Sequence, residues 1–298
     1  MLQRILEHAG RLLPESKRFP TERRLRGWLE QQRLDRADYV VVSFGKSGRT
    51  WLRVMVSRIY QKRHGLSDDL IEYGNYHRAN SALPRVLFTH DNYLRDYTGD
   101  GGGKAAFAGK PVLLLVRHPA DITMSQYFQW KHRMRPHKVL LNQYPPVDET
   151  VTPYEFMMGS SGLPKVNGWL NEWAVGLDTL KASLVVRYED MRRDNFGELR
   201  RIADFMKMNA TDAEVSDAVE WARFENMKQR EAEASSSSDR LRAGDVANPD
   251  SFKTRRAKVG GWQDYFDDAE VEAIADNIDR TLDPRFGYRR ADRANDAR

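Results

Sequence analysis

Short apolar runs alternate with longer amphipathic segments along most of the chain. Four runs rich in β-branched and other apolar residues, at 38–44, 86–89, 111–116 and 183–187, predict buried strands. The segments between and after them predict helices at about 50–62, 120–133, 164–180, 194–207 and 212–220. Strands that alternate with helices favour crossover connections. We therefore expect an α/β fold, with a single three-layer domain built on a central parallel β-sheet flanked by helices.

The two ends of the chain and one internal stretch depart from this alternation. Residues 1–36 combine many arginines with leucines and predict a basic amphipathic arm, which could pack on the domain edge or lie on a membrane surface. Residues 37–290 then form the main domain, and 291–298 form a tail. Within the domain, the polar, serine-rich stretch at about 231–254 predicts a mobile loop.

Composition narrows the class of protein. Among 298 residues, 31% are charged, and the apolar runs are too short to span a bilayer, so we expect a cytoplasmic protein. Peripheral contact of the arm with the inner membrane face stays open as the alternative to packing on the domain edge. The net charge of +5 favours acidic partners, but no nucleic-acid-binding motif is visible. With no cysteine and no histidines at metal-ligand spacing, we expect neither thiol chemistry nor a metal.

The loop at 45–51, Gly-Lys-Ser-Gly-Arg-Thr-Trp, follows the first predicted strand and leads into a helix. Backbone N–H groups and the positive helix end meet at such a loop and favour an anion. Lys46 adds a charge, and Ser47 and Thr50 add hydroxyl donors. The nucleotide-triphosphate P-loop would place a glycine at Val40, so we expect a smaller phosphate group here.

A second candidate anion site follows the third predicted strand. Arg117 leaves the strand end, Pro119 can start a helix, and Ser125 falls about two turns into that helix. The carboxyl ends of parallel strands meet at one edge of the sheet. Two anion sites at that edge predict a ligand that is phosphorylated at both ends.

These motifs resemble those of the sulfotransferases that use 3′-phosphoadenosine 5′-phosphosulfate (PAPS). Residues 45–51 resemble the family's 5′-phosphosulfate loop, and 117–125 resemble its 3′-phosphate motif with the same arginine-to-serine spacing. Residues 187–191, Arg-Tyr-Glu-Asp-Met, match a third segment, and 255–262 resemble the stretch that closes over the 3′-phosphate. The resemblance spans about 38–266 and implies a P-loop-like sulfotransferase fold, with PAPS as co-substrate and no metal.

The resemblance also implies roles for individual residues. His90, just after the second predicted strand, matches the family's catalytic base, and imidazole can take a proton from an acceptor hydroxyl near neutral pH. Lys46 and Ser125 complete the implied catalytic set. The implied donor-binding residues are Lys46, Ser47, Gly48, Arg49, Thr50, Trp51, Arg117, Ser125, Tyr188, Phe224, Arg255 and Arg256. Arg49, Ala257 and Phe88 depart from the residues that the family usually has.

The implied activity is transfer of a sulfuryl group from PAPS to an acceptor hydroxyl of a carbohydrate, glycolipid, small phenol or alcohol. Two alternatives stay open at this point. A small-molecule kinase would share the loop but needs the complete P-loop glycine and magnesium, and Val40 counts against it. A non-catalytic nucleotide-binding or membrane-associated module would have no use for His90.

Overall fold

Four parallel strands form the central sheet of the computed structural model, which describes residues 14–99, 103–148, 150–223, 225–227, 229 and 258–292. The strands are β1 (Tyr39–Ser43), β2 (Val86–Thr89), β3 (Pro111–Val116) and β4 (Ala182–Arg187), in the order β2-β1-β3-β4. Val42 pairs with Thr89, and Ser43 pairs with Leu115, so the strands end nearly level. The predicted strands and their parallel arrangement are confirmed.

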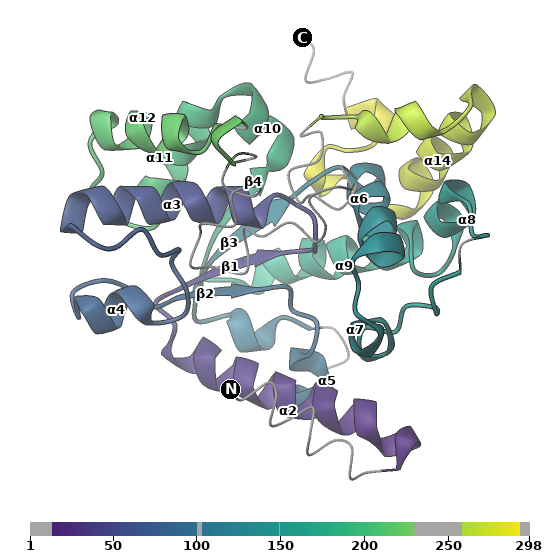
Figure 1. Ribbon diagram of the computed structural model, residues 1–298, viewed down its shortest axis with the longest axis horizontal. Helices are drawn as coiled ribbons and strands as arrows, with labels where there is room; N and C mark the ends of the chain where they lie inside the picture. The colour runs from purple at the N-terminus through teal and green to yellow at the C-terminus, as the bar shows by residue number, and fades with distance from the viewer. Residues whose placement is uncertain are drawn as a thin grey trace.

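Helices cover both faces of the sheet (Figure 1). The longer ones are α2 (Glu15–Arg36), α3 (Arg49–His64), α6 (Pro119–His132), α9 (Leu163–Gly176), α11 (Asn195–Phe205), α12 (Asp212–Trp221) and α14 (Asp268–Thr281). The shorter ones are α4 (Asn75–Ala79), α5 (Leu94–Thr98), α7 (Pro136–Leu141), α8 (Pro153–Met158) and α10 (Tyr188–Arg193). Single 3₁₀ turns are η1 (Ala105–Phe107), η2 (Leu177–Thr179), η5 (Gly261–Tyr265) and η6 (Pro284–Phe286).

Alternate residues of each strand belong to two separate hydrophobic clusters. Val40 and Val42 point into one cluster, which includes residues of α6, α9 and α14, while Val41 points into the other, with residues of α3, α11 and α12. Successive side chains of a strand point to opposite faces, and both faces are covered here. The three-layer arrangement therefore follows directly from runs that are apolar at every position.

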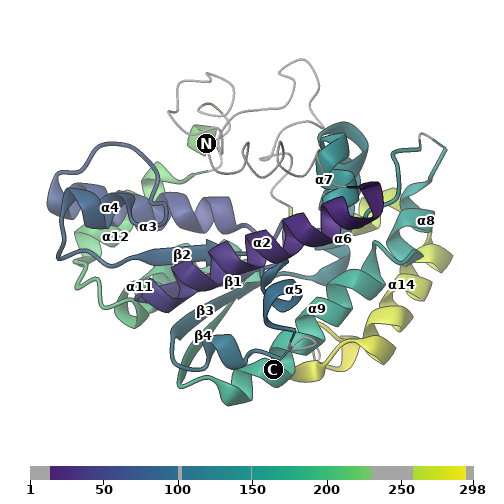
Figure 2. The same ribbon diagram turned by 90° about the horizontal axis from the view of Figure 1, so that it is seen from below.

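Helix α2 packs on the body of the protein. Figure 2 shows it crossing the view from below, with its first turns near α7. Leu34 is fully buried, and Arg26 and Glu22 form an ion pair at 2.6 Å with both side chains buried. The second part of the predicted basic arm thus uses charged residues in tertiary contacts, while residues 1–13 lie outside the described ranges. Within the described part of the chain, no helix is long and apolar enough to cross a membrane.

Candidate active site

All four strands deliver a predicted motif to the same edge of the sheet. The 45–51 loop follows β1, His90 follows β2, Arg117 follows β3, and Tyr188 follows β4. Parallel strands share the direction of their carboxyl ends, so residues far apart in sequence meet here. The sequence-based prediction that these motifs lie at one edge is confirmed by the sheet order.

The 45–51 loop turns sharply before it enters α3. Lys46 has φ of 74° and Gly48 has φ of 90°, both in the left-handed region. A Cβ on Gly48 would lie 2.6 Å from the ring of Tyr188, so only glycine lets the loop approach this side chain. The first N–H groups of the 16-residue helix α3 face the turn. This geometry suits an anion held by backbone donors.

Buried polar atoms at this loop include the Ser47 hydroxyl and Nε of Arg117, which have no hydrogen-bond partner among the described residues. Buried polar groups are normally hydrogen-bonded, so a buried donor without a partner indicates a site where a ligand can bind. Both atoms can donate to phosphate oxygens. The residues present therefore fit a phosphorylated co-substrate such as PAPS.

Arg117 connects the 45–51 loop to the C-terminal segment. Its Nη1 donates to the carbonyl of Lys46 at 3.1 Å, and its Nη2 donates to the carbonyl of Lys258 at 3.3 Å. Its guanidinium carbon lies 4.4 Å from the centre of the Tyr188 ring. One arginine thus touches three of the predicted motifs.

Trp51 and Tyr188 are brought together, as the resemblance implied. Their rings meet edge to face with centroids 5.8 Å apart, and the Trp51 indole N–H donates to the carbonyl of Ala222 at 2.8 Å. Burial raises the pKa of the Tyr188 hydroxyl, so it stays protonated near neutral pH.

Two further predicted donor-binding residues lie on helices at this edge of the sheet. Ser125 lies on α6 and is half-buried. Thr50 lies in the first turn of α3.

Three of the predicted donor-binding residues, Phe224, Arg255 and Arg256, fall outside the described ranges, as does Ala257. The predicted mobile loop at 231–254 falls there too. The described part of the C-terminal motif is held by Asp121, whose carboxylate accepts the backbone N–H groups of Gly260 at 2.9 Å and Trp262 at 3.1 Å. Asp121 lies inside the 117–125 motif, but the sequence alone does not indicate its contact with the C-terminal segment.

Contacts on both ring nitrogens fix the state of His90. Its Nδ1 lies 2.7 Å from the carbonyl oxygen of Ser43, and its Nε2 lies 2.6 Å from Nη2 of Arg49. A carbonyl can only accept and a guanidinium can only donate, so Nδ1 carries the proton and Nε2 accepts. The neutral ring therefore has its basic nitrogen on the side of Arg49. The resemblance implies a phosphate contact for Arg49, and in this structure its guanidinium lies against the histidine.

The loop around His90 is held from several sides. The Trp169 indole N–H donates to the His90 carbonyl at 3.0 Å, and the Asp91 N–H donates to the Thr89 hydroxyl at 2.8 Å. That hydroxyl in turn donates to Glu30 of α2. Burial raises the pKa of Glu30 to about 7. Sequence reasoning missed Glu30, because nothing near it in sequence indicates contact with the second strand.

The sulfotransferase domain family matches residues 110–284, which is more than half of the chain. The chain belongs to the sulfotransferase family. It is a PAPS-dependent sulfotransferase that transfers a sulfuryl group to an acceptor hydroxyl, as the sequence motifs predicted.

Curated relatives and solved structures are similar to this sulfotransferase over most of its chain. Rat sulfotransferase 2A2 is 25% identical over 80% of this chain and 81% of its own, and flavonol 3-sulfotransferase of Flaveria bidentis is 24% identical over 84% and 82%. Mouse sulfotransferase SULT7A1 complexed with PAP has a TM-score of 0.55 at 19% identity, covering 85% of this chain and 90% of its own. Retinol dehydratase with retinol and PAP has a TM-score of 0.54 at 18% identity, covering 82% of each.

Proposed function

We propose that PAPS binds across the carboxyl edge of the sheet, with its phosphosulfate end at the 45–51 loop and its 3′-phosphate beside Arg117. The main support is the unpartnered, buried Ser47 hydroxyl and Arg117 Nε at this edge. The proposed donor contacts are Lys46, Ser47, Gly48, Arg49 and Thr50 for the 5′-phosphate, Trp51, Tyr188 and Phe224 for adenine, and Arg117, Ser125, Arg255 and Arg256 for the 3′-phosphate.

In the proposed reaction, Nε2 of His90 takes the proton of the acceptor hydroxyl while the acceptor oxygen forms a bond to the sulfur of PAPS. The bond from sulfur to the phosphate oxygen breaks, and the electron pair stays on that oxygen. Lys46 stabilises the charge that develops there, an interaction stronger in the transition state than in the ground state. The Nδ1–H contact with Ser43 supports this assignment, because it keeps the ring in the tautomer that a base needs.

Arg49 has to leave His90 before the acceptor can use Nε2. Its guanidinium occupies the lone pair of that nitrogen, at 2.6 Å. We propose that Arg49 moves from His90 to the 5′-phosphate when the donor binds, since a phosphate offers a charged acceptor in place of a neutral one. Binding of the donor would then release the base for the acceptor.

The acceptor is proposed to be a small molecule that bears a hydroxyl group, by analogy with relatives whose names include a flavonol 3-sulfotransferase. A carbohydrate or glycolipid acceptor stays a prediction.

Peripheral contact with the inner membrane face also stays a prediction. Its support is two exposed apolar side chains on α2, Leu25 and Trp28, which are 40% and 43% exposed. Co-sedimentation with anionic lipid vesicles tests it, with Trp28→Ser expected to reduce the bound fraction.

Calorimetric titration with 3′-phosphoadenosine 5′-phosphate (PAP), the product that PAPS leaves after sulfuryl transfer, tests the donor site. Wild type and Arg117→Ala are compared. We expect metal-free binding of PAP, at least tenfold weaker in the variant because a charge-assisted contact is lost. Preference for ATP with magnesium, or equal affinity in the two proteins, would contradict the proposed site. Lys181→Gln is the control, because Lys181 is exposed and precedes β4 at the opposite edge of the sheet.

A further inference from the structure

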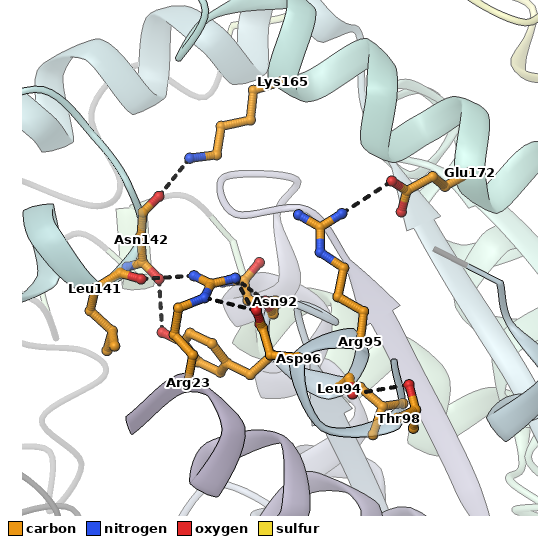
Figure 3. A network of polar contacts seen from close by, with 11 residues as sticks. Arg23, Asn92, Leu94, Arg95, Asp96, Thr98, Leu141, Asn142, Lys165 and Glu172 are labelled. Carbon is orange, nitrogen blue, oxygen red and sulfur yellow. Dashed lines mark hydrogen bonds and ion pairs between the residues drawn. The ribbon is translucent and has the colours of Figure 1, made fainter. Parts of the chain in front are cut away.

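Three cationic side chains from three different helices gather beside the loop that follows His90 (Figure 3). Arg23 comes from α2, Arg95 from α5 and Lys165 from α9. Two of them contact the segment that ends α7, where the carbonyls of Leu141 and Asn142 accept from Arg23 and Lys165. None of these residues belongs to the proposed donor site.

The two arginines have carboxylate partners. Arg23 pairs with Asp96 at 2.8 Å and also donates to the carbonyl of Asn92 at 3.1 Å. Arg95 lies 3.3 Å from Glu172, and their side chains are 50% and 32% exposed. Exposed pairs of this kind are weak and exchange partners readily. Arg95 can therefore turn toward another anion at little cost.

Lys165 has only neutral partners among the described residues. Its ammonium donates to the carbonyl of Asn142 at 2.7 Å and lies 3.9 Å from the centre of the Tyr144 ring. Burial, together with the nearby Arg23 and Arg95, lowers the pKa of Lys165 to about 8. A half-buried ammonium among other cations and without a carboxylate is costly unless an anion joins it.

Lys165 and Trp169 lie on the same face of α9, and Trp169 contacts His90, the proposed base. Trp169 is four residues further along α9, about 6 Å along the helix axis, and its indole holds the carbonyl of His90. Lys165 also lies in the first turn of a 14-residue helix, where the helix dipole favours an anion and opposes a cation. Both the dipole and the lysine therefore favour a negative group at this point.

We propose that Lys165, assisted by Arg95, binds an anionic group on the acceptor. The acceptor would then be a hydroxyl compound that also carries a carboxylate, sulfate or phosphate, with its hydroxyl at His90 and its anion at the start of α9. This inference rests on the proposed function of His90 as the base. It identifies a substrate class rather than one compound.

Paired ligands of increasing length test the proposed subsite. The probes are 4-hydroxybenzoate, 3-(4-hydroxyphenyl)propanoate and 4′-hydroxybiphenyl-4-carboxylate, each compared with its neutral primary amide. Affinities are measured by calorimetry on wild type, Lys165→Gln, Lys165→Arg and the exposed control Lys181→Gln, with and without PAP. The measured quantity is the affinity of each acid divided by that of its amide, which cancels general losses of affinity.

In wild type, we expect at least one acid to bind more tightly than its amide. The ratio should fall about tenfold in Lys165→Gln, recover in Lys165→Arg and stay unchanged in Lys181→Gln, because only the first change removes the charge from the subsite. No preference in any wild-type pair, or an unchanged ratio in Lys165→Gln, would overturn the proposal. A variant that only unfolds more easily, with its ratio unchanged, would assign Lys165 the structural role of holding the end of α7. Failure of PAP to bind would count against the donor site, and the ratios without PAP would still decide the subsite.

Discussion

Removing the ammonium of Lys104 should destabilise the loop that carries the proposed catalytic base. Lys104 pairs with Asp91 at 2.8 Å, and the two side chains are 4% and 6% exposed. Asp91 directly follows His90 and has φ of 53°, which is unusual for a residue with a side chain. The ion pair therefore holds a strained position beside the proposed base.

The expected cost of Lys104→Met follows from this burial. Breaking a buried pair by removing one partner typically costs about 3–5 kcal/mol, because the other charge is left uncompensated. Burial raises the pKa of Asp91, while Lys104 opposes that rise. Without the lysine, the pKa of Asp91 rises further, so the carboxyl group accepts a proton more readily as pH falls. The loss in free energy of unfolding should thus be largest at pH 8 and smaller at pH 5.

Urea denaturation of wild type and Lys104→Met at both pH values measures this loss. The double variant Asp91→Asn/Lys104→Met is the control, because it removes both charges and should lose less stability than the single variant. A loss below about 1 kcal/mol at pH 8, or an equal loss at the two pH values, would refute the reasoning that an unpaired buried carboxylate is responsible.

Three further changes test the donor loop and the support of the base. Gly48→Ala should cost about 1–3 kcal/mol of stability by thermal unfolding and weaken PAP binding, because its φ is positive and its Cβ would clash with Tyr188. Glu30→Gln should remove a pH dependence of the free energy of unfolding. Burial raises the pKa of Glu30 from 4.5 to about 7, so ionising this carboxyl group in the folded protein costs about 3 kcal/mol. Wild type should therefore lose about this much stability relative to the variant as pH rises from 4.5 to above 7. Arg49→Thr should weaken PAP binding about tenfold in calorimetry, since the proposed phosphate contact is lost.

Each of these expectations has a clear contrary result. Equal stability of Gly48→Ala and wild type would show that the loop relaxes around the added methyl group. Parallel pH curves for Glu30→Gln and wild type would contradict a raised pKa of the carboxyl group. Unchanged PAP affinity in Arg49→Thr would contradict the movement of Arg49 from His90 to the donor.

The strands and their motifs could be predicted because both depend on local sequence. Buried parallel strands are apolar at every position, so runs such as residues 111–116 stand out, and each motif begins where such a run ends. Lys46, His90 and Arg117 therefore come to one edge as soon as the strands are parallel. The positions of these residues follow from topology more than from details of packing.

The contacts between distant segments could not be predicted in this way. Glu30 and Thr89 are 59 positions apart, and Arg49 and His90 are 41 apart. Their meeting depends on how α2 and α3 pack, which charge and periodicity do not specify. The arginines of α2 similarly indicated a basic surface, yet Arg23 and Arg26 are buried in ion pairs. A count of charges cannot distinguish a solvated arginine from one that is paired inside the fold.

The most direct test is to detect sulfuryl transfer and its dependence on His90. Wild type and His90→Asn are incubated with PAPS and a panel of hydroxyl acceptors, and mass spectrometry detects products that have gained one SO3 group. We expect turnover by wild type and a rate lower by about 10²–10⁴ in His90→Asn, with PAP affinity unchanged, because a general base contributes about that much. Equal rates in the two proteins, or no transfer to any acceptor by a wild type that binds PAP, would contradict the proposed active site.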